Sequence, residues 1–306
     1  MIISLTGANG FIGNNLLMKL LSHNHSVKVL STQSVLHESA SYHKGNFSSP
    51  DNILYEFLKG SDVIINCAGE ILEEKKMQST NVHGVKRLLN IINNKKLDIK
   101  FLQLSSAGVY KKNIDLIHYE YLDEKNKEYS NNIYEQSKLD GEKEIIANSG
   151  RYLILRPTAI FSKNMTNNSL RNLIKYVKKG LFFYIGEKDS MLSYLHLDDL
   201  TDTIVNIIHL DHFNNRIYNL SNDTKLEDTI NSITNNLNIK TVDRKINRKL
   251  YKILNILSPR FLKLPISNSI YNALTSKTII DSSLAKNELR FKPKRDLHDC
   301  INELIK

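Results

Sequence analysis

The sequence has few cysteines, no membrane-spanning run and no export signal. Its two cysteines, Cys67 and Cys300, stand far apart and match neither a disulfide framework nor a zinc site, so we expect a reducing, cytoplasmic location. No run approaches the roughly 20 apolar residues that cross a bilayer. The apolar start MIISL continues directly into TGANG, without the cleavage region of a signal peptide. These absences predict a soluble, unprocessed protein.

The composition excludes a disordered chain and a mini-protein, because 41% of the residues are hydrophobic. A length of 306 residues predicts two domains at about 150 residues each. The formal net charge of +10 predicts a surface that attracts phosphates, nucleotides or acidic lipid. We do not expect nucleic-acid binding, because the charge is spread along the chain and no recognised reading module is present.

Short apolar segments alternate with longer amphipathic ones over the first 160 residues. This rhythm predicts a doubly wound parallel sheet covered by helices. The expected strands are 1–5, 27–30, 63–66, 101–105 and 152–155, and the expected helices are 11–21, 52–59, 80–93 and 134–148. The rhythm breaks after Pro157. We therefore expect a first domain over residues 1–162 and a smaller C-terminal α/β domain over 163–306, with some strands returning to the first sheet.

A glycine-rich segment, ISLTGANGFIGNNLL, joins the first strand to the first helix. Its glycines permit a tight turn, a close approach of backbone to a pyrophosphate, and close packing of helix on strand. The N–H groups that begin the helix stabilise the anion. The alternative is a turn without a ligand, but the flanking strand and helix favour a Rossmann-type, NAD(P)-binding domain. The expected contacts are Gly7, Asn9, Gly10, Phe11, Ile12 and Gly13.

The acidic residue that takes the ribose hydroxyls of NAD is missing. No Asp or Glu follows Gly13 until Glu38, and the second strand ends in Leu30, Ser31 and Thr32. A carboxylate there would repel a 2′-phosphate, whereas the Ser31 hydroxyl and a nearby lysine such as Lys44 would accept one. The sequence therefore favours NADP. NAD stays the alternative, because no arginine is in place to clamp that phosphate.

Tyr134 and Lys138 are four residues apart in a predicted helix, so both project from one face. A phenol titrates near 10, and a nearby ammonium favours the phenolate. Tyr134 would then exchange a proton with a substrate hydroxyl, and Ser106, at the end of a predicted strand, would hydrogen-bond the same oxygen. The alternative is a partly solvated helix face. No metal is expected, because His23 and His25 lie in a predicted exposed loop without further ligands.

Eight motifs in order resemble the extended short-chain dehydrogenase/reductase family, especially its nucleotide-sugar epimerase, dehydratase and ketoreductase group. They are TGANGFIG (6–13), DVIINCAG (62–69), NVHG (81–84), LSSAGVY (104–110), YEQSK (134–138), LRPTAIF (155–161), YLHLDDL (194–200) and IYNLSN (217–222). The resemblance implies that Tyr134 is the acid/base, that Lys138 also binds nicotinamide-ribose hydroxyls, and that Ser106 positions the reacting oxygen. It further implies a homodimer and cofactor contacts from Cys67, Ala68, Gly69, Asn81, Tyr134, Lys138 and Pro157, with Arg156 near the nicotinamide end.

Departures from the family pattern narrow the reaction. Ala107 and Gly108 stand where the 4,6-dehydratases carry acidic residues, and neither side chain moves a proton. The resemblance then implies a 4-ketoreductase or 4-epimerase of a nucleotide-activated sugar. However, Leu192 replaces an arginine that pairs with the substrate diphosphate, and a second family arginine is missing near Lys277. Either other cations substitute, with Arg171, Lys188 and Lys277 as candidates, or the head group differs.

The basic, apolar segment 244–263 has two interpretations, a membrane-surface helix or a cap over the sugar site. Membrane contact would make a lipid-linked sugar a plausible substrate. Two further hypotheses are an oxidoreductase that acts on an apolar alcohol and a non-catalytic NAD(P)-sensing protein. His196 precedes two aspartates, which invites a metal or catalytic hypothesis. The resemblance implies instead that the histidine is hydrogen-bonded and that the aspartates cap the following helix.

Overall fold

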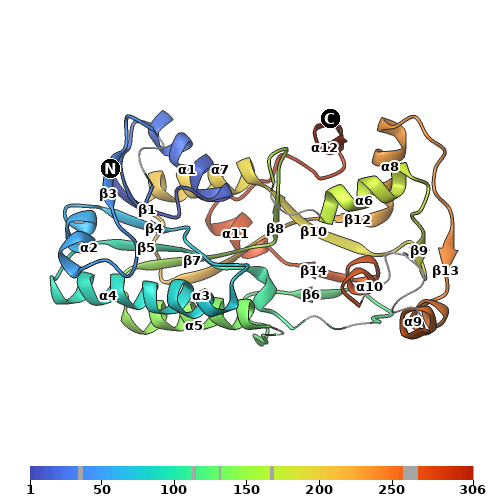
Figure 1. The fold of residues 1–306 in the computed structure, drawn as a ribbon, viewed down its shortest axis with the longest axis horizontal. Helices are drawn as coiled ribbons and strands as arrows, with labels where there is room; N and C mark the ends of the chain where they lie inside the picture. The colour runs from blue at the N-terminus through green and yellow to red at the C-terminus, as the bar shows by residue number, and fades with distance from the viewer. Residues whose placement is uncertain are drawn as a thin grey trace.

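The computed structural model describes residues 1–33, 37–111, 113, 115–130, 132–165, 169–257 and 268–305, and its larger part is a parallel sheet (Figure 1). The seven strands run in the order β11-β7-β5-β4-β1-β2-β3, and each neighbouring pair is parallel. The order reverses between β1 and β4, which makes the sheet doubly wound. The bounds are β1 (Ile2–Thr6), β2 (Ser26–Ser31), β3 (Ser41–Lys44), β4 (Val63–Asn66), β5 (Lys100–Leu104), β7 (Tyr152–Pro157) and β11 (Arg216–Leu220).

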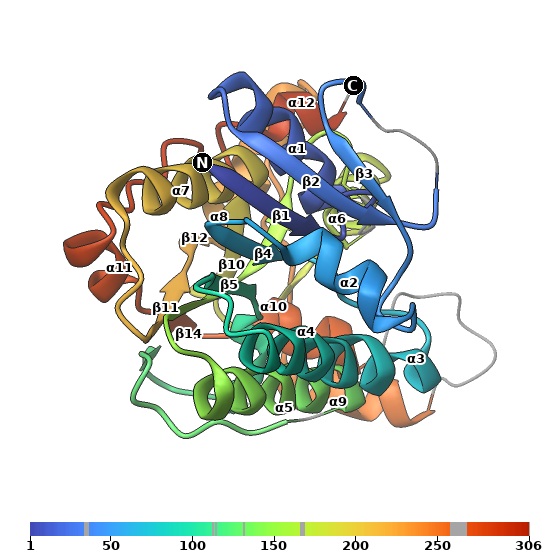
Figure 2. The ribbon, with the colours of Figure 1, turned by 90° about the vertical axis from the view of Figure 1, so that its left-hand side faces the viewer.

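Helices cover both faces of this sheet, which is why its central strands are apolar on both sides (Figure 2). On one face lie α1 (Phe11–Ser22), α7 (Leu197–Leu210) and α11 (Ser283–Glu288), which share one apolar core with the strands. On the other face lie α2 (Asp51–Leu58), α4 (Gly84–Asn94) and α5 (Ile133–Asn148). Three shorter turns, α3 (Glu74–Gln78), the π-helical η1 (Ser79–His83) and the 3₁₀ η2 (Ala107–Val109), follow strands β4 and β5.

The smaller part of the molecule lies on the right of Figure 1 and has its own apolar core. A three-stranded sheet in the order β12-β10-β8 connects it to the large sheet, and two pairs, β13-β9 and β14-β6, complete it. The strands are β6 (Glu120–Leu122), β8 (Ala159–Phe161), β9 (Tyr184–Ile185), β10 (Met191–His196), β12 (Asn222–Lys225), β13 (Lys245–Ile246) and β14 (Thr278–Ile280). The helices are α6 (Ser169–Lys178), α8 (Leu226–Asn236), α9 (Arg248–Leu257), α10 (Asn268–Thr275) and α12 (Ile301–Ile305).

The predicted Rossmann-type fold is confirmed, and each strand expected in the first 160 residues is present. Strand β3 was not predicted, because its sequence, SYHK, is largely polar and the strand lies half-exposed at the edge of the sheet. The expected helix 80–93 is divided into η1 and α4. Strand β11 returns to the large sheet beside β7 and α7 packs on α1, so the division at residues 162/163 stays a prediction. Among the described residues, no helix is long and apolar enough to cross a membrane.

Candidate active site

The glycine loop leaves one side of the chain open for a ligand. Gly7 has φ +71°, and a Cβ there would lie 2.6 Å from the carbonyl carbon of Cys67. A Cβ on Gly13 would lie 2.1 Å from the oxygen of Gly7, so these two glycines are required by the protein itself. A Cβ on Gly10 would meet only that same oxygen, at 3.2 Å. Gly10 begins α1 without a side-chain cap, which leaves the N–H groups of the first turn for an anion.

A cavity of about 470 Å³ opens beside this loop at the carboxyl ends of the strands. The Asn9 amide donates to the Ser31 hydroxyl at 3.0 Å, which holds the loop against the end of β2. The described lining contains both polar and apolar residues: Thr6, Gly7, Ala8, Asn9, Leu30, Ser31, Thr32, Gly45, Asn46, Phe47, Ser48, Ala68, Lys76, Ser79 and Thr80. Its position and lining fit the adenosine half of a dinucleotide.

Lys76 is the cation that the structure places in this cavity, and no sequence pattern pointed to it. It comes from α3, and its Nζ lies 2.8 Å from Glu73. Lys44, named from the sequence for the same task, is an exposed neighbour of Ser31 across the β2–β3 pair and is not part of the described lining. Phe11 and Ile12 pack against apolar clusters, so their contact with a cofactor stays a prediction.

Ser106, Tyr134 and Lys138 converge just beyond the end of β5, and we call this place the reaction edge. Ser106 follows β5, and its hydroxyl accepts the N–H of Gly108 at 3.0 Å and hydrogen-bonds Tyr134. The Lys138 ammonium donates to the Leu104 carbonyl at 3.1 Å and lies 5.9 Å from the centre of the Tyr134 ring. A Cβ on Gly69 would lie 2.9 Å from Nζ of Lys138, so Gly69 makes room for this side chain.

Burial dominates the acid–base properties of the reaction edge. Burial raises the pKa of Tyr134, the hydrogen bond from Ser106 opposes it, and the Glu135 carboxylate raises it further. The expectation that Lys138 makes this phenol acidic is therefore not met in this structure. Burial lowers the pKa of Lys138 to about 8, against the opposing influence of Cys67 and Glu142. Tyr134 thus holds its proton at neutral pH, and Lys138 is mainly an ammonium.

Glu135 and Cys67 also border the reaction edge. Glu135 Oε1 lies 3.3 Å from where a Cβ on Gly108 would be, which sets a carboxylate beside Ser106 that the sequence did not single out. Burial raises the pKa of the Cys67 thiol to about 12, so this cysteine stays protonated and unreactive. Cys67 and Ala68 lie against Gly7, where the resemblance places the cofactor.

Asn81 connects the segment after β4 to helix α5. Its amide accepts from the Glu70 N–H at 3.0 Å and donates to the Glu70 carbonyl at 3.1 Å and to the Ser137 hydroxyl at 2.8 Å. A Cβ on Gly141 would lie 2.4 Å from the Asn81 carbonyl oxygen, so α5 approaches the π-helical turn closely. Asn81 therefore positions the helix that carries Tyr134 and Lys138, and its expected contact with the cofactor stays a prediction.

Arg156 lies in a buried ionic network beneath the reaction edge. Its guanidinium is 0% exposed and pairs with Glu142 and Glu128, and it donates to the Tyr110 hydroxyl at 2.8 Å. The Nε–Oε1 distance to Glu142 is 3.0 Å. Glu142 is one turn after Lys138 on α5, so the network fixes this helix against β7. Arg156 is therefore a structural residue, while Pro157 ends β7 opposite Leu220.

The histidines outside the reaction edge have structural roles. His196 caps α7 by accepting the N–H of Asp198 at 3.1 Å, and buried Asp199 accepts the N–H groups of Lys294 and Arg295. Burial lowers the pKa of His196. His25 is buried, contrary to the expectation of an exposed loop, and its ring lies 5.3 Å from that of His209.

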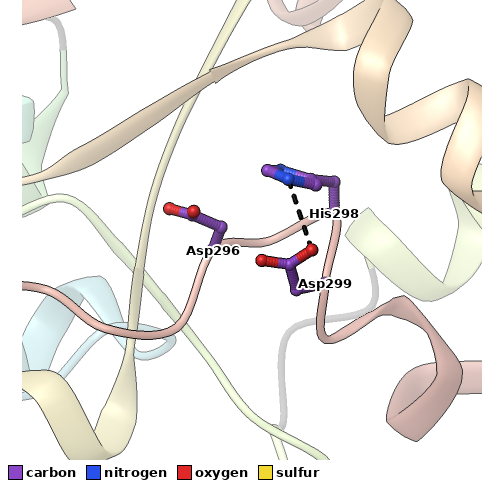
Figure 3. A group of neighbouring side chains, drawn as sticks. All are labelled: Asp296, His298 and Asp299. Carbon is purple, nitrogen blue, oxygen red and sulfur yellow. Dashed lines mark ion pairs between the residues drawn. The ribbon is translucent and has the colours of Figure 1, made fainter.

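A group of ligand-type side chains lies near the C-terminus (Figure 3). The ligand atoms of Asp296, His298 and Asp299 lie within 4.8 Å of one another. Asp296 accepts from the Asn222 amide at 2.6 Å, and His298 lies 3.4 Å from Asp299. None of the three is buried, so the group is explained as a surface cluster of polar contacts.

A second cavity, of about 280 Å³, lies in the smaller part of the molecule, and we call it the apolar cavity. Its described lining is Ser169, Leu170, Asn172, Leu173, Tyr176, Leu181, Phe182, Phe183, Leu192, Tyr194, Tyr251, Ile270, Ala273 and Leu274. Leu192, which stands in place of the family arginine, is part of this wall. Helix α9 supplies buried Tyr251 to the cavity and leaves Leu250 and Ile253 exposed. Residues 258–263 of the basic segment lie outside the described residues, so membrane contact stays a prediction.

Comparison with known proteins assigns the family. The NAD dependent epimerase/dehydratase family matches residues 3–221. The chain belongs to this family. Membership supports an enzyme that uses a nicotinamide cofactor. A chloroplastic epimerase family protein, the SDR39U1 homolog of Arabidopsis thaliana, is 23% identical over 225 residues, which are 67% of this chain and 61% of that protein. The chain thus spans about 61% of the length of this curated relative.

Solved members of the epimerase/dehydratase family share the fold. UDP-glucuronic acid 4-epimerase from Bacillus cereus, in complex with NAD, has a TM-score of 0.74 at 18% identity and covers 99% of this chain and 95% of its own. UDP-glucose 4-epimerase from Thermotoga maritima, with UDP-glucose, has a TM-score of 0.72 at 16% identity. The match covers 100% of this chain and 97% of that protein. dTDP-glucose 4,6-dehydratase from Bacillus anthracis, in complex with NAD, has a TM-score of 0.71 at 19% identity, covering 100% and 95%.

Proposed function

We propose that this chain is an NAD(P)-dependent oxidoreductase or epimerase that moves a hydride to or from C4 of an activated sugar. The observation that carries the proposal is the convergence of Ser106, Tyr134 and Lys138 at the edge of the sheet where the glycine loop opens. Two of the structurally similar proteins are named as 4-epimerases of UDP-sugars, which supports the choice of carbon.

Each residue of the reaction edge has a distinct task. When bound, a nicotinamide supplies or accepts the hydride. Ser106 holds the reacting oxygen, Tyr134 exchanges a proton with it, and the Lys138 ammonium stabilises negative charge on the phenol and binds ribose hydroxyls. A phenol whose pKa is raised keeps its proton at neutral pH and is ready to protonate a ketone oxygen.

Replacing Tyr134 by Phe tests the mechanism, because the ring stays and the proton is lost. We expect kcat to fall by about 10² to 10⁴, with the affinity for NADH and NADPH unchanged. Tyr121→Phe is the matched control, since Tyr121 is 64% exposed. Unchanged turnover in Tyr134→Phe would reject the proposal. Wild-type protein that binds cofactor but never exchanges hydride would instead support an NAD(P)-sensing protein.

A further inference from the structure

The apolar cavity lies between α6, β10, α9 and α10 (Figure 1) and is large enough for a substantial substituent. Its volume of about 280 Å³ is roughly twice the ~150 Å³ that admits a benzene ring in a protein core. Leu170, Phe182 and Leu192 form part of its wall and are nearly inaccessible to solvent. The cavity therefore has room for a ring or a short alkyl chain.

No charged residue is part of the described lining of this cavity. The hydroxyls of Ser169 and Tyr194 hydrogen-bond each other at 3.0 Å, which further lowers the polarity of the wall. A diphosphate needs cations or several N–H donors around it. Within the described lining, an occupant with two negative charges would find no charged partner, and desolvation without pairing is costly.

The three cations that were candidates to bind a diphosphate are engaged elsewhere. Lys188 pairs with Glu227 and, at 2.6 Å, with Asp243. Lys277 pairs with Asp189 and donates to the Ile117 carbonyl at 2.7 Å. Arg171 donates to the Lys163 carbonyl at 2.7 Å. Recruiting Lys188 or Lys277 for a diphosphate would break an existing ion pair.

Two contacts link the apolar cavity to elements that lie beside the reaction edge. Tyr194 in its wall pairs in register with Ala159, which is two residues after the end of β7 at Pro157. Phe11, at the start of the helix after the glycine loop, packs against the apolar cluster that contains Leu170 and Leu192. A group attached to a sugar at the reaction edge can therefore extend into this cavity.

We propose that the apolar cavity binds an uncharged aliphatic or aromatic group of the substrate, in place of a nucleotide. The proposal rests on the proposed hydride transfer at a sugar carbon, and it replaces the activated head group of that sugar by an uncharged group. Specificity then comes from burying carbon and from the absence of any partner for a phosphate in the described lining.

Isothermal titration calorimetry with methyl, butyl and hexyl β-D-glucopyranosides tests the proposal, in the presence of saturating NADH. Each methylene that enters the cavity is expected to tighten binding by about fourfold until the cavity is full. The phenyl glucoside distinguishes an aromatic group from an aliphatic one. Affinity that does not change with chain length, or UDP-glucose that binds more tightly than hexyl glucoside, would overturn the proposal.

Two variants on α10 locate the binding. Ala273 is exposed and contributes to the lining, so Ala273→Trp fills the cavity without disturbing the core. Asn272→Trp adds the same ring to the neighbouring residue, which is not part of the described lining. We expect Ala273→Trp to abolish the chain-length dependence and Asn272→Trp to preserve it; equal behaviour contradicts the proposal. Tyr134→Phe should bind the glucosides like wild type. If wild-type protein shows the chain-length dependence but never exchanges hydride with any of the sugars, the proposed reaction is contradicted and the cavity proposal stays intact.

Discussion

The reaction edge and the apolar cavity differ in the charged residues that they contain. Beneath the reaction edge, Arg156, Glu142 and Lys138 are buried and held by partners on β5, β7 and α5. The described lining of the cavity contains no charged group. Buried charge needs a complete set of partners, whereas an apolar wall needs only shape and carbon. Charge is thus retained and paired at the reaction edge, while the described lining of the cavity carries none.

Removing the guanidinium under the reaction edge is expected to have the largest effect. Arg156→Met leaves Glu142 buried without its main partner, which should lower the free energy of unfolding by about 3–5 kcal/mol. Urea denaturation measures this loss. The double variant Arg156→Met/Glu142→Leu removes both charges and should recover part of it. A single variant within about 1 kcal/mol of wild type would show that buried charge is not what distinguishes the two regions.

Adding one methyl group to the glycine loop should separate the two regions functionally. A Cβ on Gly13 would lie 2.1 Å from the Gly7 oxygen, so Gly13→Ala must displace the loop. We expect the affinity for NADPH to fall by about 100-fold or more, while hexyl glucoside still binds. Gly150→Ala is the control, because a Cβ there meets nothing within 4 Å. Equal loss of both ligands would mean that the two sites are not independent.

Replacing the buried lysine should trade function for stability. The pKa of Lys138 is lowered to about 8 in the folded protein, so between pH 8 and its ordinary value the unfolded chain binds more protons. Wild-type stability therefore gains from this group as pH rises from about 8, and its burial is a penalty at pH 7. Lys138→Met should lose activity yet raise the free energy of unfolding by about 1–3 kcal/mol at pH 7. Thermal and urea unfolding at pH 7 and 10 would reveal this difference, which should shrink at the higher pH.

The smallest expected effect concerns the cofactor's 2′-phosphate. Lys76 lines the cofactor cavity and Lys44 does not, so Lys76→Ala should raise the KM for NADPH by about threefold while that for NADH stays constant. Lys44→Ala is the matched control. Steady-state kinetics with each cofactor measures the two KM values. An equal change in both would contradict a role of Lys76 in binding the 2′-phosphate of NADP.

The central sheet and the residues of the reaction edge were predictable because their signals are local. Gly7, Gly10 and Gly13 lie within seven consecutive residues, and Tyr134 and Lys138 lie one helical turn apart. Their spacing alone therefore predicted that the members of each group lie close together. Strand β3 and Lys76 were not predictable in this way. The strand is polar, and the lysine lines the cavity only because the fold brings α3 and the glycine loop to the same cavity.

Local sequence was enough to predict most strands and helices of the first 160 residues, the glycine loop and the pairing of Tyr134 with Lys138, since each depends on residues a few positions apart. The three-dimensional arrangement was needed to show that the pKa of Tyr134 is raised, that Arg156 is structural, and that the described lining of the apolar cavity carries no charge. The physical reason is that burial and the pairing of charges depend on which distant segments surround a side chain, and no local pattern records that.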